Sequence, residues 1–244
     1  GEPVGVQVSC SIPPGFGEKI YDVYEGIRQA VSDAGTSILG GDTNAAGEFS
    51  LSIVSLGQVK RDNLLVRKGA KSGDLMGVTG ILDRFNYGYF QYSKSENCDF
   101  ESMLRQAPQI RAGFLLGELG CVTSCIDLPD GLIKTLEDNV PFGLGFLIDD
   151  KSIPIGCFGE ESGSEVSPNY VHASNPAGDL QLLFTISPQA RGLVETTFSK
   201  ENLPIYWIGE VISESGIKIN IGDRIVQPTV EGFIHRFEGF KLFP

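Results

Sequence analysis

The sequence predicts a mixed α+β protein that is built from two successive regions. Some short segments alternate apolar and polar residues, as half-buried strands do, and others repeat apolar residues at helical spacing. The polar turn Lys60–Asn63 separates these elements into two groups. We therefore expect two domains, residues 1–62 and residues 63–244.

The first region is expected to form a strand, a helix and further strands. A Pro-Pro-Gly turn ends the first strand, and Gly35 is well placed to end the helix that follows. The expected elements are the strand Val4–Cys10, the helix Ile20–Val31, the apolar run Ile38–Leu39 that stops at Gly40, and the strand Phe49–Ile53.

The second region alternates strands and helices. Pro108 predicts a break within one long helical pattern, because proline disrupts a helix interior. The stretch from residue 153 to residue 173 is rich in Gly, Ser and Pro and is expected to be a loop. The expected elements are a strand that ends at Gly80, a helix over Phe100–Leu119, a strand over Thr123–Leu128, a helix over Asp130–Asn139, a strand over Leu180–Ile186, a helix from Ser187 or Pro188, and a strand over Ile205–Val211.

The acidic composition limits the partners. The chain carries 19 Lys and Arg against 31 Asp and Glu, a net charge of −12. A field of this sign repels phosphate backbones, so neither nucleic acid nor an anionic membrane is expected as a partner. An acidic protein binds ATP through bridging cations, which makes Mg²⁺ the first cofactor to consider. From composition alone, it is equally consistent that the negative charge only keeps the protein surface soluble.

Cysteine and histidine usage excludes several chemistries. The five cysteines are odd in number and include no Cys-x-x-Cys pair, so we expect reduced thiols in a cytoplasmic protein. Neither His172 nor His235 lies in the setting of a serine nucleophile. No apolar run approaches the ~18–20 residues that span a membrane, and the first residues do not resemble a signal peptide.

The tetrapeptide Gly40-Gly41-Asp42-Thr43 is the first candidate site. Glycine lets the backbone approach a ligand closely, and an aspartate at a strand end can hold Mg²⁺ against phosphate oxygens. Thr43 can donate a hydrogen bond to the same group. The same four residues also suit an ordinary turn.

Two further segments suggest phosphate chemistry. Arg67 and Lys71 lie in a glycine-containing loop that ends at Asp74 and leads into Val78-Thr79-Gly80, although the loop lacks Walker A spacing. A solvated surface turn is the alternative. Asp127 and Asp130 are three residues apart where a strand gives way to a helix, so they can share a metal ion. Asp130 is equally well placed as the N-cap of that helix.

In this order, the segments resemble the successive blocks of the thiamine-monophosphate kinases, within the ATP-binding superfamily that includes aminoimidazole-ribotide synthetase. The resemblance covers nearly the whole chain, and the block that begins at Arg67 is the most specific. Related hydrogenase-maturation and purine-synthesis proteins match that block less well. The matching segments are Gly40–Thr43, Arg67–Asp74 with Val78–Gly80, Ile126–Leu132, Gly178–Thr185, Pro204–Val211 and Gly239–Phe240.

The resemblance implies a two-domain synthetase-like fold. Its N-terminal domain, partial here, is β-rich, contributes to ATP binding and forms a homodimer, and its C-terminal domain is an α/β sandwich. The implied reaction transfers the γ-phosphoryl group of ATP to thiamine monophosphate, with Mg²⁺ as cofactor. Carried over by position, the site residues are Asp42, Asp127 and Asp130 for metal, Asp130 also as a catalytic group, Gly40, Gly41, Thr43 and Arg67 for ATP, and Asp179 and Phe240 for the substrate.

Several positions depart from the family pattern. The resemblance implies that an earlier acidic glycine turn and further aspartates are missing ahead of this chain. A proline replaces the usual serine at Pro129, and neutral residues replace acids at Thr135, Gly178 and Gln181. Lys241-Leu242 replaces Asp-His near the C-terminal signature, and Phe240 equally suits core packing. The alternative function is a non-catalytic relative that binds a nucleotide, a phosphate ligand or a partner protein.

Overall fold

The computed structural model describes residues 1–85, 88, 92, 104–139, 141–156, 168–174 and 178–229. The contacts divide the chain into two units, Gly1–Leu64 and Leu65–Pro244. Each unit combines helices with a sheet, so the mixed α+β fold class is confirmed.

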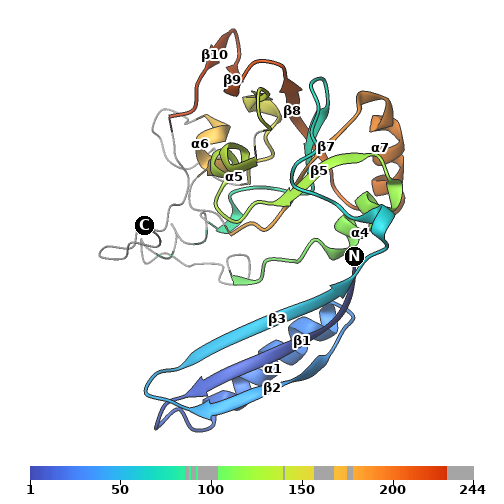
Figure 1. Ribbon diagram of the computed structural model, residues 1–244. Helices are drawn as coiled ribbons and strands as arrows, with labels where there is room; N and C mark the ends of the chain where they lie inside the picture. Colours follow the sequence, from blue (N-terminus) through green and yellow to red (C-terminus); the bar gives the residue numbers. More distant parts are fainter. Residues whose placement is uncertain are drawn as a thin grey trace. The chain divides into compact units, whose positions relative to one another are not determined.

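The first unit is a three-stranded sheet with one helix on one face (Figure 1). Its central strand β1 runs parallel to β2 and antiparallel to β3. The core beneath the helix consists of Val6, Val8, Ile27 and Val31. The elements are β1 (Glu2–Ile12), α1 (Lys19–Asp33), β2 (Ile38–Ala45), β3 (Ser50–Gln58) and the 3-10 turn η1 (Arg61–Asn63).

Gly35 ends α1 as predicted. Its φ is 68°, its amide donates to the carbonyl of Ser32 at 2.9 Å, and the amide of Thr36 donates to Val31 at 2.8 Å. This pair of bonds is the Schellman arrangement, which satisfies carbonyls at the helix end and favours glycine in the left-handed position.

The prediction that the second strand stops at Gly40 is wrong. β2 continues through both glycines to Ala45, because Gly40 and Gly41 adopt φ values of 154° and 153° that keep the chain extended. A Cβ atom on Gly41 would lie 1.8 Å from the carbonyl oxygen of Val8. Glycine therefore allows β2 to lie against β1 at this point.

In the second unit, the described residues form a seven-stranded sheet of order β10-β9-β6-β8-β4-β7-β5. Neighbouring strands are antiparallel except for the parallel pair of β6 and β9. The elements are β4 (Leu75–Val78), α4 (Ile110–Leu119), β5 (Val122–Asp127), α5 (Leu132–Asn139), β6 (Gly145–Asp149), η2 (Asp150–Ser152), α6 (Asn169–Ser174), β7 (Leu182–Ile186), η4 (Pro188–Ala190), α7 (Arg191–Lys200), β8 (Tyr206–Ile212), β9 (Gly216–Ile221) and β10 (Arg224–Val226).

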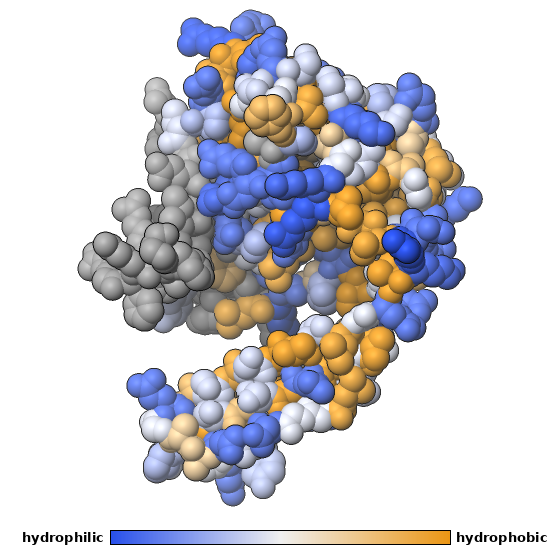
Figure 2. All heavy atoms as spheres, viewed as in Figure 1, coloured by the Kyte–Doolittle hydropathy of each residue, from blue (hydrophilic) through white to orange (hydrophobic). Residues whose placement is uncertain are grey.

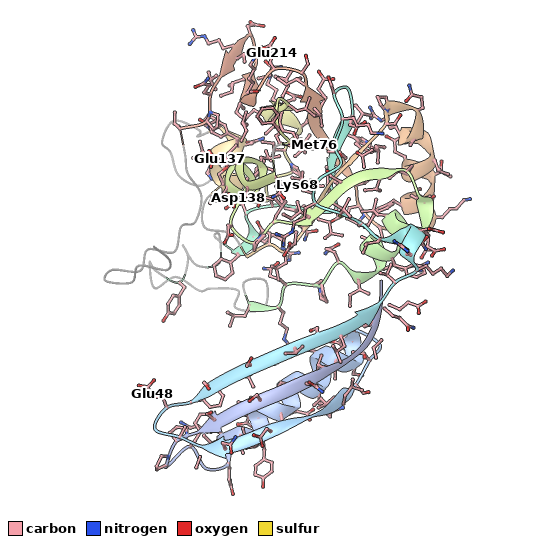
Figure 3. All side chains as sticks on the ribbon, viewed as in Figure 1. Glu48, Lys68, Met76, Glu137, Asp138 and Glu214 are labelled. Atoms are coloured by element: carbon pink, nitrogen blue, oxygen red, sulfur yellow. The ribbon has the colours of Figure 1, made fainter. Side chains whose placement is uncertain are left out.

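Helices cover both faces of this sheet, which is the predicted α/β sandwich (Figure 1). On one face α5 and α6 bury Leu132, Leu136 and Tyr170 against strand residues that include the fully buried Met76 of β4 (Figure 3). On the other face α4 and α7 pack around Phe184.

Several boundaries differ from the predictions. Residues 100–103 lie outside the described residues, and α4 begins at Ile110, two residues after Pro108. Within the expected loop from residue 153 to residue 173, the structure places α6, whose first amides are held by the carboxylate of Asp150. No helix in the described part of the chain combines the length and apolar character needed to cross a bilayer.

Candidate functional site

The second unit gathers three of the sequence blocks at one edge of its sheet. β4 and β5 both run antiparallel to β7, so their C-terminal ends meet the start of β7. Val78 pairs with Leu183, and Asp127 pairs with Leu182. The residues that follow β4, follow β5 and precede β7 are therefore neighbours, although about 100 residues separate the first from the last along the chain.

Asp127 and Asp130 occupy this edge. Asp127 is exposed at the end of β5, and Asp130 is half-buried in the turn that leads to α5. Gly131, with φ of 92°, packs so closely on α6 that a Cβ atom would lie 2.7 Å from the carbonyl oxygen of Ser174. The close packing on α6 therefore fixes the position of the turn that carries both carboxylates.

The lysine of α5 nearest this turn pairs with a carboxylate of its own helix. Lys134 forms an ion pair with Asp138, and this contact is the main reason that the pKa of Lys134 rises, with Glu137 and Asp130 as smaller contributors. Figure 3 shows Glu137 and Asp138 together on α5. Because Lys134 is paired with Asp138, the structure gives Asp130 no direct ion pair with it.

The glycine-containing loop Arg67–Asp74, which precedes β4, is held against β5 by a buried carboxylate. Asp74 is 4% exposed, and its carboxylate accepts the amide of Lys71 at 2.9 Å and the hydroxyl of Thr123 at 2.6 Å. A Cβ atom on Gly69 would lie 2.1 Å from the carbonyl oxygen of Thr123. The side chains of Arg67 and Lys71 remain exposed, so both remain accessible to an anion.

Asp179, expected to bind substrate, points into the protein instead. It is 2% exposed, and its carboxylate accepts the amides of Asp83 at 2.5 Å and Phe85 at 3.2 Å. Burial raises the pKa of the Asp179 carboxyl, and the hydrogen bonds from these amides and that of Arg84 oppose the rise because they stabilise the carboxylate.

The first unit holds Gly40–Thr43 and brings serines around Asp42. Asp42 is exposed, accepts the amide nitrogen of Asn44's side chain at 2.6 Å, and pairs across the sheet with Ser9, which pairs in turn with Ser52. These side chains therefore share the face opposite α1.

Thr43 lies on the other face of β2, where its hydroxyl is 3.2 Å from that of Tyr24 in α1. The side chains of Asp42 and Thr43 therefore lie on opposite faces of the sheet, although both were expected at one bound group. Because β2 continues as a strand, neighbouring side chains point to opposite faces.

The structure thus distributes the predicted residues over the two units. Arg67, Asp127, Asp130 and Asp179 belong to the second unit, and the Gly40–Thr43 segment belongs to the first. Phe240 lies outside the described residues.

Sequence reasoning missed the roles of Thr79, Gln181, Asp83 and His172. The hydroxyl of Thr79 donates to Gln181 at 3.1 Å, which buries a neutral amide where the family pattern has an acid. His172 Nδ1 lies 3.7 Å from Asp83, and burial lowers the pKa of His172 whereas Asp150 opposes that change. The comparison with the family pattern had identified Gln181 as a departure from an acid, but no sequence signal linked Asp83 to His172.

The donor set suits a divalent metal bound jointly with a ligand. Within the described ranges, no three His, Cys, Asp or Glu side chains are grouped to hold a metal ion by themselves. Mg²⁺ commonly uses one or two carboxylates and takes its other oxygens from substrate phosphates and water. The exposed Asp127 with Asp130, and the exposed Asp42, fit that pattern.

Known proteins share both the sequence and the fold. Residues 1–59 match the family model described as AIR synthase related protein, N-terminal domain. The chain is 28% identical to the thiamine-monophosphate kinase of Pyrococcus horikoshii over 241 residues, which cover 96% of this chain and 73% of that protein.

Solved structures give the same result at the level of fold. The thiamine-monophosphate kinase of Stenotrophomonas maltophilia K279a aligns with a TM-score of 0.78 at 22% identity, over 90% of this chain and 72% of its own. The structure described as AaThiL complexed with AMPPCP and TMP aligns with a TM-score of 0.74 at 19% identity, over 95% of this chain and 74% of that one.

The first 59 residues thus match the AIR synthase-related model, and the chain shares its fold with solved thiamine-monophosphate kinases. Most of the chain aligns with thiamine-monophosphate kinases and carries their successive blocks. The chain is thus similar to thiamine-monophosphate kinases over nearly its whole length.

Proposed function

We propose that this protein transfers the γ-phosphoryl group of ATP to the phosphate of thiamine monophosphate and forms thiamine diphosphate. The observation that carries the proposal is the sheet edge of the second unit, where the ends of β4 and β5 bring Asp127 and Asp130 beside the start of β7. The similarity to kinases of this substrate supports it.

Phosphoryl transfer needs positioning and charge neutralisation more than a covalent nucleophile. Asp127 and Asp130 would hold Mg²⁺, which when bound neutralises charge on the phosphate oxygens. The exposed Arg67, in the loop that precedes β4, would bind a phosphate of ATP. Within the first unit, Asp42 would be a ligand of Mg²⁺, and the backbone of Gly40 and Gly41 would lie close to a nucleotide phosphate.

The direct test is turnover of ATP and thiamine monophosphate with Mg²⁺, followed by chromatography of thiamine diphosphate. Asp130→Asn should lower kcat by about 100-fold or more, because it removes a charge from the metal site and retains the side-chain shape. The matched control is Asp138→Asn on α5, an exposed carboxylate that pairs with Lys134. Equal activity of the two variants would remove Asp130 from the site.

Binding of nucleotide tests Asp42 separately. Asp42→Asn should weaken Mg²⁺-dependent ATP binding by at least about 1.4 kcal/mol, which is tenfold. A turn-forming role predicts unchanged binding, because asparagine is also favourable in turns. Nucleotide binding without turnover would instead support the non-catalytic alternative.

We also propose a cytoplasmic homodimer with no nucleic-acid or membrane partner. Cys10, Cys121 and Cys125, the cysteines within the described residues, are free thiols, as expected in a reducing compartment. The net charge of −12 disfavours binding to polyanions.

A further inference from the structure

We propose that Asp179 is a positioning residue, whose buried carboxylate fixes the Thr79–Phe85 segment at the sheet edge that carries Asp127. The inference changes the role expected for Asp179, from contact with the substrate to action through the backbone. Its kinetic consequence rests on the proposed kinase function, whereas its structural consequence does not.

Each oxygen of the carboxylate already accepts a backbone amide. One oxygen accepts the amide of Asp83 at 2.5 Å and the other accepts the amide of Phe85 at 3.2 Å. Asp179 is only 2% exposed, so no face of the carboxylate is available to a ligand in solution. A buried carboxylate that accepts backbone amides fixes the chain that donates them.

The backbone on both sides of these bonds is unusual. Asp83 has φ of 76° and Leu180 has φ of 49°, and among the described residues Asn202 is the single other non-glycine residue with positive φ. Non-glycine residues keep this conformation only when their surroundings impose it, and such positions concentrate at functional sites. Two of these positions meet at Asp179.

A second set of contacts ties the same two segments together. Thr79 donates through its hydroxyl to Gln181 at 3.1 Å and accepts the amide of Leu182 at 2.9 Å. A Cβ atom on Gly178 would lie 3.0 Å from the ring of Phe85, so these segments approach closely.

The start of β7 also reaches the turn that carries the metal-site carboxylates. The carbonyl oxygen of Gln181 accepts the amide of Leu128 at 2.9 Å, directly after Asp127. The start of β7 therefore joins the two segments: Asp179 binds the Thr79–Phe85 segment and Gln181 binds the Asp127–Asp130 turn, so Asp179 can set the position of one relative to the other.

The test compares Asp179→Ala with Asp149→Ala in the whole chain. Asp149 is the control, because it is another aspartate that accepts a hydrogen bond, from the hydroxyl of Ser152 at 2.6 Å, and among the described residues its carboxylate has no hydrogen bond to either of the segments that Asp179 joins. Hydrogen exchange of the Asp83 and Phe85 amides is measured without ligand, and kcat and KM are measured for both substrates.

We expect Asp179→Ala to speed exchange of the Asp83 and Phe85 amides by at least about tenfold, and Asp149→Ala to leave it unchanged. We expect kcat to fall by at least about tenfold more in Asp179→Ala than in the control, with KM for ATP within about twofold of its original value. Asp179→Asn retains one acceptor oxygen, so both quantities should be intermediate.

Unchanged exchange in Asp179→Ala would overturn the inference, as would a rise in KM for thiamine monophosphate alone, which a direct substrate contact predicts. Faster exchange with kinetics equal to those of the control would also overturn it. If the unaltered chain shows no turnover, the proposed function fails, and amide exchange alone then decides whether Asp179 fixes the segment.

Discussion

At the scale of single residues, two adjacent glycines allow backbone strain at positive φ to be distinguished from a steric clash of the Cβ atom. Gly40 and Gly41 have almost the same φ, 154° and 153°. A Cβ atom on Gly41 would meet Val8 at 1.8 Å, whereas a Cβ atom on Gly40 would have no atom within 4 Å. The pair distinguishes backbone strain from a steric clash.

Gly41→Ala should therefore destabilise the protein more than Gly40→Ala. Both variants share a strain of about 1–3 kcal/mol, and the clash with Val8 should add at least about 2 kcal/mol to the loss at residue 41. Urea unfolding, followed by circular dichroism, measures the difference. Equal losses would show that β1 and β2 separate easily at this point.

The reactivity of Cys125 follows from its burial. Desolvation, with a smaller contribution from Asp127, raises the pKa of the Cys125 thiol to about 12. A thiol that titrates this high is almost entirely protonated at pH 8, and only the thiolate is reactive. We expect Cys125 to resist iodoacetamide at pH 8 in the folded protein and to react after denaturation, as mass spectrometry of the labelled peptides would show.

The same pKa gives a stability change at high pH. The folded pKa lies above the unfolded value of about 8.5, so the stabilisation is complete below pH 8.5 and is lost as pH rises towards 12. Cys125→Ala should remove that part of the pH dependence. Rapid labelling of Cys125 in the folded protein would contradict the burial on which both expectations depend.

The candidate residues were predictable to different degrees. Asp127 and Asp130 follow a clear strand pattern, so the sequence located them correctly at a strand end. The orientation of Asp179 was not predictable, because the amides that bind its carboxylate are 94 and 96 residues away. Local patterns carry no information about such distant partners.

At the scale of elements, α6 illustrates why a short helix escapes sequence analysis. Its six residues, Asn169–Ser174, are too few to show a periodic apolar pattern. The first amides of α6 are held by Asp150, which is 19 residues earlier in the chain. Helices of this length depend on tertiary contacts and not on propensity.

Asp150→Ala should lower the free energy of unfolding by about 1–2 kcal/mol, because it leaves two amides of α6 without their acceptor. Urea denaturation measures the loss. The neighbouring variant Asp149→Ala is the control, since Asp149 accepts one hydroxyl, from Ser152 at 2.6 Å. Equal losses for the two variants would contradict the capping role.

The strands β6, β9 and β10 were also not predicted. β6 has five residues and β10 has three, and Gly145 and Gly216 begin β6 and β9. Short segments bounded by glycine are difficult to distinguish from turns. In the structure, β6 is defined as a strand by its pairing with β8 on one side and with β9 on the other.

At the scale of the whole molecule, the first unit exposes apolar side chains on both faces of β3. Leu51, Ile53, Val54 and Leu56 are between 39% and 52% exposed, and Figure 2 shows apolar surface along this part of the sheet. Among the described residues, β1 is hydrogen-bonded on both edges and β3 on one, so of the two strands predicted to form the dimer β3 has the free edge. Such a surface favours association.

We predict a homodimer of 26.3 kDa chains that associates through β3. Light scattering at micromolar concentration should give twice the mass of one chain, and Val54→Asp should shift the equilibrium towards monomer because it places a charge in the contact. Leu193→Asp is the control, since Leu193 is equally exposed, at 52%, on α7 of the other unit. A monomeric unaltered chain would count against the dimer.

The strand order of the first unit also determines when it can fold during synthesis. β1 emerges from the ribosome before either of its partners, yet it becomes the central strand between β2 and β3. At about 5–20 residues per second, the interval from Ile12 to Gln58 lasts roughly 2–9 s. Throughout that interval the nascent chain presents an unpaired edge of β1. A chaperone that covers this edge therefore protects the chain from association most before β3 has left the exit tunnel.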